Sequence, residues 1–165
     1  MGRKIISAGH ICLDITPVFP RDKQYDKLSR LLIPGKLLNN IGAADVHTGG
    51  SVANTGLALK KLGADVTLLC KVGNDEFGHL VQNIVARYGA TGVLVDDNSD
   101  TSYSVVLAVP GLDRIFLHCP GANDTFSNAD IPDEMLEGAS IFHLGYPTLM
   151  KKLYENDGAE LITLL

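Results

Sequence analysis

Two adjacent glycines and an asparagine form the stretch of this chain best suited to binding a small molecule. Gly49 and Gly50 precede a helix expected over 51–62, and Asn54 lies one turn inside it. Glycine lets the backbone approach a ligand closely, and the N–H groups of a first helical turn have no partner within the helix. Asn is otherwise unfavourable inside a helix. The pattern predicts a pocket for a polyhydroxylated or phosphorylated small molecule.

Two further polar residues follow expected β elements. Asp14 comes shortly after a strand expected over 4–9, and Asn123 follows a hairpin expected over 102–118. Ligands of open α/β sheets bind beyond the carboxyl ends of the strands. An aspartate, an asparagine and free backbone N–H groups together supply the acceptors and donors that vicinal hydroxyls need.

Strands and helices alternate along most of the chain. Strands are expected over 4–9, 65–72, 92–95 and 140–144, and helices over 51–62, 76–88 and from about 147. Such alternation predicts an α/β fold with a doubly wound, mostly parallel sheet flanked by helices. The hairpin 102–118 interrupts the alternation. Together with the irregular segment 17–45, it is expected to form a small separate β element at the edge of the sheet.

Local signals set several boundaries. The helix over 76–88 has an apolar stripe, a cap at Asn74 or Asp75, and Gly89 as its end. Lys71 is expected at a solvated strand end, and the sequence Asn-Asp-Gly over 156–158 is expected to break the last helix. The chain then stops inside a new apolar segment, so we expect it to be the N-terminal piece of a longer protein.

Composition narrows the classes of partner. The net charge of −5, the absence of Trp and the lack of a basic stripe argue against nucleic-acid binding. No apolar run reaches the length of a membrane span. The three cysteines are widely spaced in apolar runs, which predicts buried thiols in a reducing cytoplasm. The five histidines show no metal-ligand spacing, so no metal site is expected among these residues.

The motifs resemble a known family in their order and spacing. Residues 49–54 (Gly-Gly-Ser-Val-Ala-Asn), 62–63 (Leu-Gly) and 72–78 (Val-Gly-Asn-Asp-Glu-Phe-Gly) are similar to the first signature of the PfkB carbohydrate kinases, in the ribokinase-like superfamily. Residues 9–14 resemble that family's first strand with its substrate-gripping aspartate. The hairpin with residues 120–123 resembles its β lid.

This resemblance implies an ATP-dependent sugar kinase. Asp14 would accept hydrogen bonds from sugar hydroxyls, Gly49 and Gly50 would offer their backbone, and Asn54 would bond a further hydroxyl. Lid segments near 15–48 and 100–119 would cover the sugar, with Tyr103 a candidate contact. Asn123 is a candidate substrate contact as well. ATP and Mg²⁺ are implied for the full-length enzyme, and so is a possible homodimer formed through the lid.

The catalytic half of the family pattern is missing from these residues. The family's second signature, Asp-Thr-x-Gly-Ala-Gly-Asp, carries the general base and the anion hole. Asp124 and Thr125 are followed by no such glycines. We therefore expect no catalytic residue in this chain, and we expect the chain alone to be inactive.

Two other functions remain open beside the sugar kinase. A nucleoside kinase of the same superfamily would recognise the same ribose hydroxyls, and a noncatalytic sugar-binding module would keep the pocket without the chemistry. Ser51 and Gly145 depart from residues found in some sugar kinases, which argues against ribose. A Rossmann dinucleotide binder fits poorly, because no G-x-G-x-x-G follows the first strand.

Overall fold

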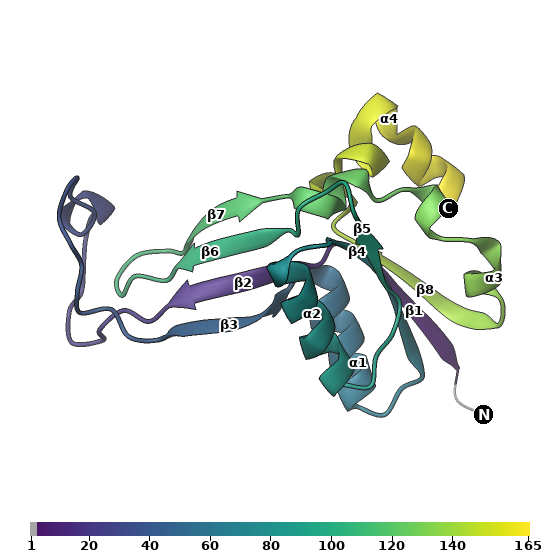
Figure 1. Cartoon of the computed structure of the whole chain (residues 1–165), viewed down its shortest axis with the longest axis horizontal. Helices are drawn as coiled ribbons and strands as arrows, with labels where there is room; N and C mark the ends of the chain where they lie inside the picture. The colour runs from purple at the N-terminus through teal and green to yellow at the C-terminus, as the bar shows by residue number, and fades with distance from the viewer. Residues whose placement is uncertain (1–2) are drawn as a thin grey trace.

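The computed structural model describes residues 3–165 and contains two four-stranded sheets (Figure 1). The core sheet has the order β5-β4-β1-β8, and all of its pairings are parallel. Its strands are β1 (Lys4–Gly9), β4 (Val66–Gly73), β5 (Val93–Asp96) and β8 (Ala139–Gly145). The α/β fold with a mostly parallel sheet is therefore confirmed.

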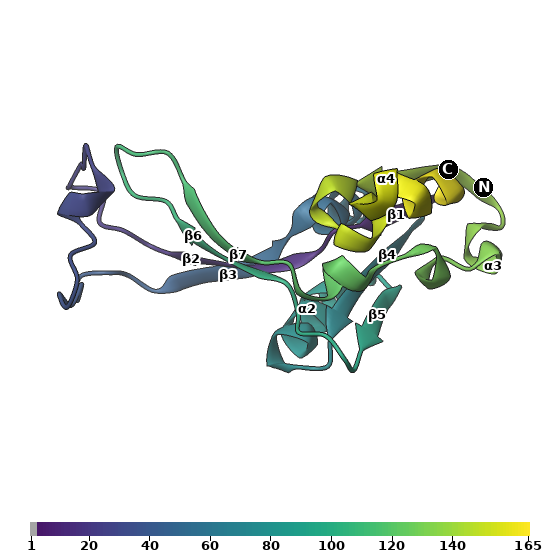
Figure 2. The ribbon, with the colours of Figure 1, turned by 90° about the horizontal axis from the view of Figure 1, so that it is seen from above.

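Both faces of the core sheet are covered, as in other parallel sheets. Along β4, Leu68 and Cys70 face one hydrophobic cluster and Leu69 faces another, because successive side chains alternate. The first cluster packs against α1 (Ala58–Lys61) and α2 (Glu76–Arg87), and the second packs beneath α4 (Lys151–Leu164) (Figures 1 and 2).

The outer sheet extends away from this core (Figures 1 and 2). Its order is β3-β2-β6-β7, formed by β2 (Cys12–Pro17), β3 (Ala44–Gly49), β6 (Tyr103–Leu107) and β7 (Ile115–Cys119). The pairing of β6 with β7 is antiparallel, as the expected hairpin requires. Since β1 ends at Gly9 and β2 begins at Cys12, the outer sheet starts at the carboxyl end of a core strand.

The segment between β2 and β3 has its own small core at the far end of the outer sheet. Phe19 and Leu31 are buried against Val109 beyond β6, and the single 3₁₀ turn η1 (Leu28–Arg30) lies within the segment. This cluster fixes the tip of the outer sheet without support from the main core.

The helix expected over 51–62 differs from a regular α-helix. A helical segment is present as expected, but residues Val52–Leu57 form the π-helix η2, followed by the short α-helix Ala58–Lys61. Apolar spacing over so few residues does not separate i→i+4 from i→i+5 bonding, so the sequence did not predict the π-helix. π-Turns are rare and are frequent at functional sites, and this one contains Asn54.

The expected cap and end of α2 and the expected break in the last helix agree with the structure. Asp75 caps α2, its side chain accepting the Gly78 N–H, and Gly89 follows with φ +64°. Residues 156–158 take left-handed backbone and break α4. Short elements complete the chain: η3 (Gly121–Thr125), η4 (Asn128–Asp130), α3 (Asp133–Leu136) and η5 (Pro147–Leu149). Among the described residues, no helix is long and apolar enough to cross a membrane.

Candidate functional site

A row of four polar side chains crosses the whole outer sheet. The strand registers pair Asp14 with His47 on one side and with Ser104 on the other, and Ser104 pairs in turn with His118. Directly paired residues share a face of the sheet. The Ser104 hydroxyl lies 3.0 Å from His118 Nδ1, and His47 Nε2 lies 3.9 Å from the Asp14 carboxylate. We call His47, Asp14, Ser104 and His118 the polar row.

The Asp14 carboxylate is held at the centre of this row. The Cys12 thiol donates a hydrogen bond to it over 3.3 Å. Burial, and then the Asp14 charge, raise the pKa of Cys12 to about 12, so the thiol stays protonated as a donor. A Cβ at Gly49 would overlap the carboxylate, lying 2.6 Å from Asp14 Cγ. Glycine at 49 therefore makes room for the Asp14 side chain.

Gly50 makes room for a second side chain, that of His10. Gly50 has φ +86°, and a Cβ there would lie 2.5 Å from the His10 carbonyl oxygen and 2.6 Å from His10 Nδ1. The same carbonyl accepts the Val52 N–H at 3.1 Å. The two glycines thus bring a carboxylate and an imidazole to the start of the helical segment.

His10 is buried where the core sheet meets the polar row. Its ring centroid lies 5.5 Å from that of His118 and 6.1 Å from that of Tyr146. Burial, and to a smaller extent the neighbouring His118, lower the pKa of His10 to about 4, while Asp14 and Asp124 oppose the shift. The imidazole is therefore neutral at neutral pH.

Asn54 lies beside the polar row. Its exposed side chain lines a pocket of about 280 Å³ that His47 and Thr48 also line. The structure brings Asp14, Gly49 and Gly50 together directly. Asn54 shares with them only the neighbour His47, which lines the same pocket as Asn54 and pairs with Asp14.

Tyr103 lies apart from this group, so its expected role as a substrate contact stays a prediction. Tyr103 pairs with Leu13, so it points to the face opposite Asp14. Its ring meets that of Phe77 in α2 edge-to-face at 5.5 Å. The hairpin prediction could not assign this face, because β2, which pairs with β6 on the side of Asp14, lies 90 positions earlier in the chain.

Asn123 also differs from the expected substrate contact. The residue is fully buried. Its Oδ1 accepts the Ile11 N–H at 3.1 Å, and its Nδ2 donates to the carbonyls of Ile11 and Pro120. All donors of the amide are used inside the protein. Asn123 therefore positions the chain between β1 and β2, with both amide protons bonded inside the protein; its expected contact with a substrate stays a prediction.

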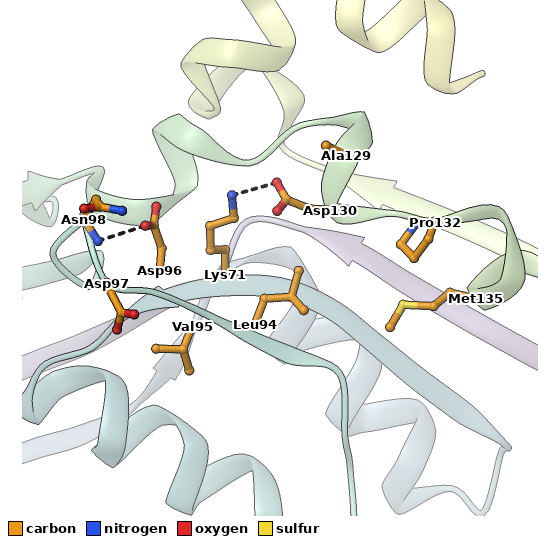
Figure 3. A pocket seen from close by; sticks show the side chains of 10 residues that line it. All are labelled: Lys71, Leu94, Val95, Asp96, Asp97, Asn98, Ala129, Asp130, Pro132 and Met135. Atoms are coloured by element: carbon orange, nitrogen blue, oxygen red, sulfur yellow. Dashed lines mark hydrogen bonds and ion pairs between the residues drawn. The ribbon is translucent and has the colours of Figure 1, made fainter.

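A second pocket lies elsewhere, at the carboxyl ends of β4 and β5 (Figure 3). It measures about 580 Å³. Lys71 lies within it, paired with Asp130 at 2.7 Å and donating to the Thr125 carbonyl at 3.0 Å. The side chain of Lys71 is only 11% exposed, so its expected solvation was wrong. Figure 3 shows this ion pair spanning from β4 to η4.

The acidic side of the same pocket is also committed to internal bonds. Asp96 accepts hydrogen bonds from Ser99 and Thr125 at 2.7 and 2.9 Å. Bonds from Ser99 and from the Asn98 N–H lower the pKa of the Asp96 carboxyl. These contacts hold the loop after β5 in place, so the Asp96 carboxylate is already bonded within the protein. Over residues 3–165, no group of three His, Cys, Asp or Glu side chains could hold a metal ion.

Sequence comparison relates the chain to sugar kinases. The model of the pfkB family of carbohydrate kinases matches residues 11–164. Fructokinase-2 of Oryza sativa subsp. japonica is 27% identical over 150 residues, covering 88% of this chain and 40% of its own length. Probable fructokinase-5 of Arabidopsis thaliana is 32% identical over 108 residues, covering 63% of this chain and 33% of its own length. The chain thus spans well under half the length of these relatives.

Structural comparison gives the same fold. A ribokinase from Giardia lamblia matches with a TM-score of 0.70 and 19% identity, over 86% of this chain and 44% of its own. A fructokinase with bound ATP from Xylella fastidiosa matches with a TM-score of 0.65 and 23% identity, over 87% and 42%. At these identities the likeness concerns the fold.

Proposed function

The chain belongs to the pfkB family of carbohydrate kinases, and from that premise we propose that it forms the sugar-binding and lid portion of an ATP-dependent sugar kinase. One observation carries the proposal. Asp14 stands in the polar row, against Gly49, where the outer sheet leaves the carboxyl end of β1. A carboxylate at that place suits a hydroxyl-rich guest, because it accepts from several hydroxyls at once.

The neighbouring groups complement the carboxylate. Asp14 Oδ1 already accepts the Cys12 thiol, which leaves Oδ2 on the side of His47 for sugar hydroxyls. Ser104 and Asn54 add groups that both donate and accept. In this proposal the outer sheet acts as the lid. By covering the sugar it excludes water, which would otherwise compete as a phosphoryl acceptor.

ATP supplies the phosphoryl group in the proposed reaction. The acceptor hydroxyl takes the γ-phosphoryl group, ADP leaves, and the hydroxyl proton passes to a base. We assign neither that base nor a Mg²⁺ site to this chain: the described residues hold no cluster of metal ligands, and the sequence has no Gly-Ala-Gly-Asp segment. On this proposal the 165-residue chain binds the acceptor but transfers no phosphate by itself.

Fructose is the first acceptor to test. The sequence relatives are named fructokinases, and the identity of residues 51 and 145 argues against ribose. A nucleoside acceptor and a noncatalytic sugar-binding module are the alternatives.

Calorimetric titration of the chain with D-fructose, D-ribose and adenosine tests the proposal. We expect the tightest binding for fructose and a loss of roughly 10- to 150-fold for Asp14→Asn, since hydrogen bonds to a charged group contribute about 1.5–3 kcal/mol. Asp22→Asn, an exposed carboxylate at the tip of the outer sheet, is the matched control and should bind as the unchanged chain does. Binding that is insensitive to Asp14→Asn would contradict the assignment, and preference for adenosine would favour a nucleoside kinase.

We also propose a homodimer formed through the lid. The outermost strands β3 and β7 carry exposed apolar side chains, with Val46 at 41%, Phe116 at 53% and Leu117 at 55% exposure. A second copy would cover these side chains and the open strand edges. Sedimentation equilibrium checks this: Phe116→Ser should shift a dimer toward monomer, and a monomeric unchanged chain would refute it.

The free thiols of Cys12, Cys70 and Cys119 support the proposed location in a reducing cytoplasm.

A further inference from the structure

His10 has polar atoms that the fold does not use. The residue is 3% exposed, and neither ring nitrogen has a hydrogen-bond partner among the described residues. Its backbone is fully engaged, since its N–H donates to Gly145 and its carbonyl accepts from Val52. Buried polar groups are almost always paired, because an unpaired group has lost water without replacement. An unpaired imidazole at this position therefore indicates that a bound molecule supplies its hydrogen-bond partner.

The position of His10 adjoins the proposed sugar site. Gly50 provides the space that the imidazole fills. One neighbouring ring is His118, at the end of the polar row, and another is Tyr146, directly after β8. The imidazole thus lies on the core-sheet side of the site, across the two glycines from Asp14.

Tyr146 carries the exposed ring beside His10. Its backbone is left-handed, with φ +60°, although it is not a glycine, and such strain clusters at functional sites. The residue is 51% exposed, so part of it meets solvent and is not packed against the protein.

The chemistry of His10 complements that of Asp14. A neutral imidazole has one N–H donor and one acceptor lone pair, whereas a carboxylate only accepts. A hydroxyl can satisfy either ring nitrogen. The pKa of about 4, set first by burial, means that the ring brings no positive charge at neutral pH. His10 therefore offers no positive charge that could pair with a carboxylate on the guest.

We propose that His10 is an acceptor-specificity residue, which hydrogen-bonds one hydroxyl of a neutral sugar held by Asp14. The inference rests on the proposed function and narrows it. The acceptor is a neutral sugar, because the Asp14 carboxylate at the centre of the polar row would repel the carboxylate of a sugar acid. His10 takes no part in phosphoryl transfer itself.

The test pairs a residue change with a hydroxyl change. The 165-residue chain is titrated with D-fructose, with each of its monodeoxy analogues, and with D-gluconate. One analogue should bind about tenfold more weakly than fructose, as one lost hydrogen bond implies, and His10→Leu should bind that analogue and fructose equally. His10→Gln, which keeps a donor and an acceptor, should retain part of the discrimination. D-gluconate should bind at least about tenfold more weakly than fructose.

Thermal unfolding separates this role from a structural one. His10→Leu removes two unpaired nitrogens at similar volume, so its Tm should be unchanged or raised. His79→Leu, at an exposed histidine of α2, is the control and should leave both binding and discrimination unchanged. If both His10 variants unfold at a lower Tm and still bind fructose about tenfold more tightly than the analogue, His10 has a structural role and the inference is overturned. The proposed sugar site at Asp14 would be unaffected by that result. Equal affinity for gluconate would overturn the neutral-sugar assignment, and no binding of any sugar by the unchanged chain would overturn the proposed function with it.

Discussion

The contact between Gly49 and Asp14 yields a quantitative prediction about stability. In Gly49→Ala the new Cβ would lie 2.6 Å from Asp14 Cγ and 2.9 Å from Oδ1, well inside contact distance. The carboxylate must then move by about an ångström and loses its bond from Cys12. Overpacking of this kind costs about 1–2 kcal/mol. Gly49 has no positive φ, so backbone strain does not add to the cost.

A double-mutant cycle isolates the clash. In an Asp14→Ala background the carboxylate is gone, and Gly49→Ala should cost nothing or stabilise by a few tenths of a kcal/mol through reduced freedom of the unfolded chain. The coupling energy between the two sites should therefore be about 1–2 kcal/mol. In urea, with a slope of about 2 kcal/mol per molar, this corresponds to a midpoint shift of roughly 0.5–1 M that appears in only one background.

The matched control is Gly42→Ala. Gly42 also has no positive φ, and its added Cβ would meet only Val18, with 3.3 Å to the nearest atom. Its effect should be the same with and without the Asp14 carboxylate. If Gly49→Ala costs the same in both backgrounds, the carboxylate does not lie against Gly49, and the explanation of the paired glycines is wrong.

Two further predictions concern stability. The pKa of His10 is about 4 in the folded chain, against the ordinary value of 6.5, so the unfolded chain binds this proton more tightly. The free energy of unfolding should therefore fall by about 3 kcal/mol as the pH drops from about 6.5 to about 4. Urea titrations across that range check this, and an equal fall in His10→Leu would refute it. Asp75→Ala should lower the free energy of unfolding by about 2 kcal/mol, since this carboxylate caps α2 and accepts two backbone N–H bonds of 2.7 Å; a loss below about 0.5 kcal/mol in thermal unfolding would contradict the cap.

Local signals in the sequence were sufficient for most of the fold. The apolar stripe, the Asp75 cap and Gly89 defined α2 within one residue, and the Asn-Asp-Gly break over 156–158 lies where the backbone turns left-handed. These features depend on residues within a few positions of one another. The alternation of strands and helices is also visible in local stretches of sequence, and it predicted the parallel core sheet.

The polar row could not be predicted, because it depends on pairing between distant strands. His47, Ser104 and His118 reach Asp14 only through the registers of three strand pairs. The face on which Tyr103 lies could not be predicted for the same reason, since a one-residue change in register reverses the face of every side chain. Lys71 was misjudged because its partner Asp130 lies 59 positions away in a separate turn.

The most direct test of the central claim locates the sugar on the chain. In ¹H–¹⁵N spectra of the 165-residue chain titrated with D-fructose, we expect saturable shifts at the amides of Asp14, Gly49 and Gly50, and we expect Asp14→Asn to abolish them. Shifts confined to the pocket around Lys71 and Asp130, or shifts unchanged by Asp14→Asn, would show that the sugar binds elsewhere and would contradict the claim.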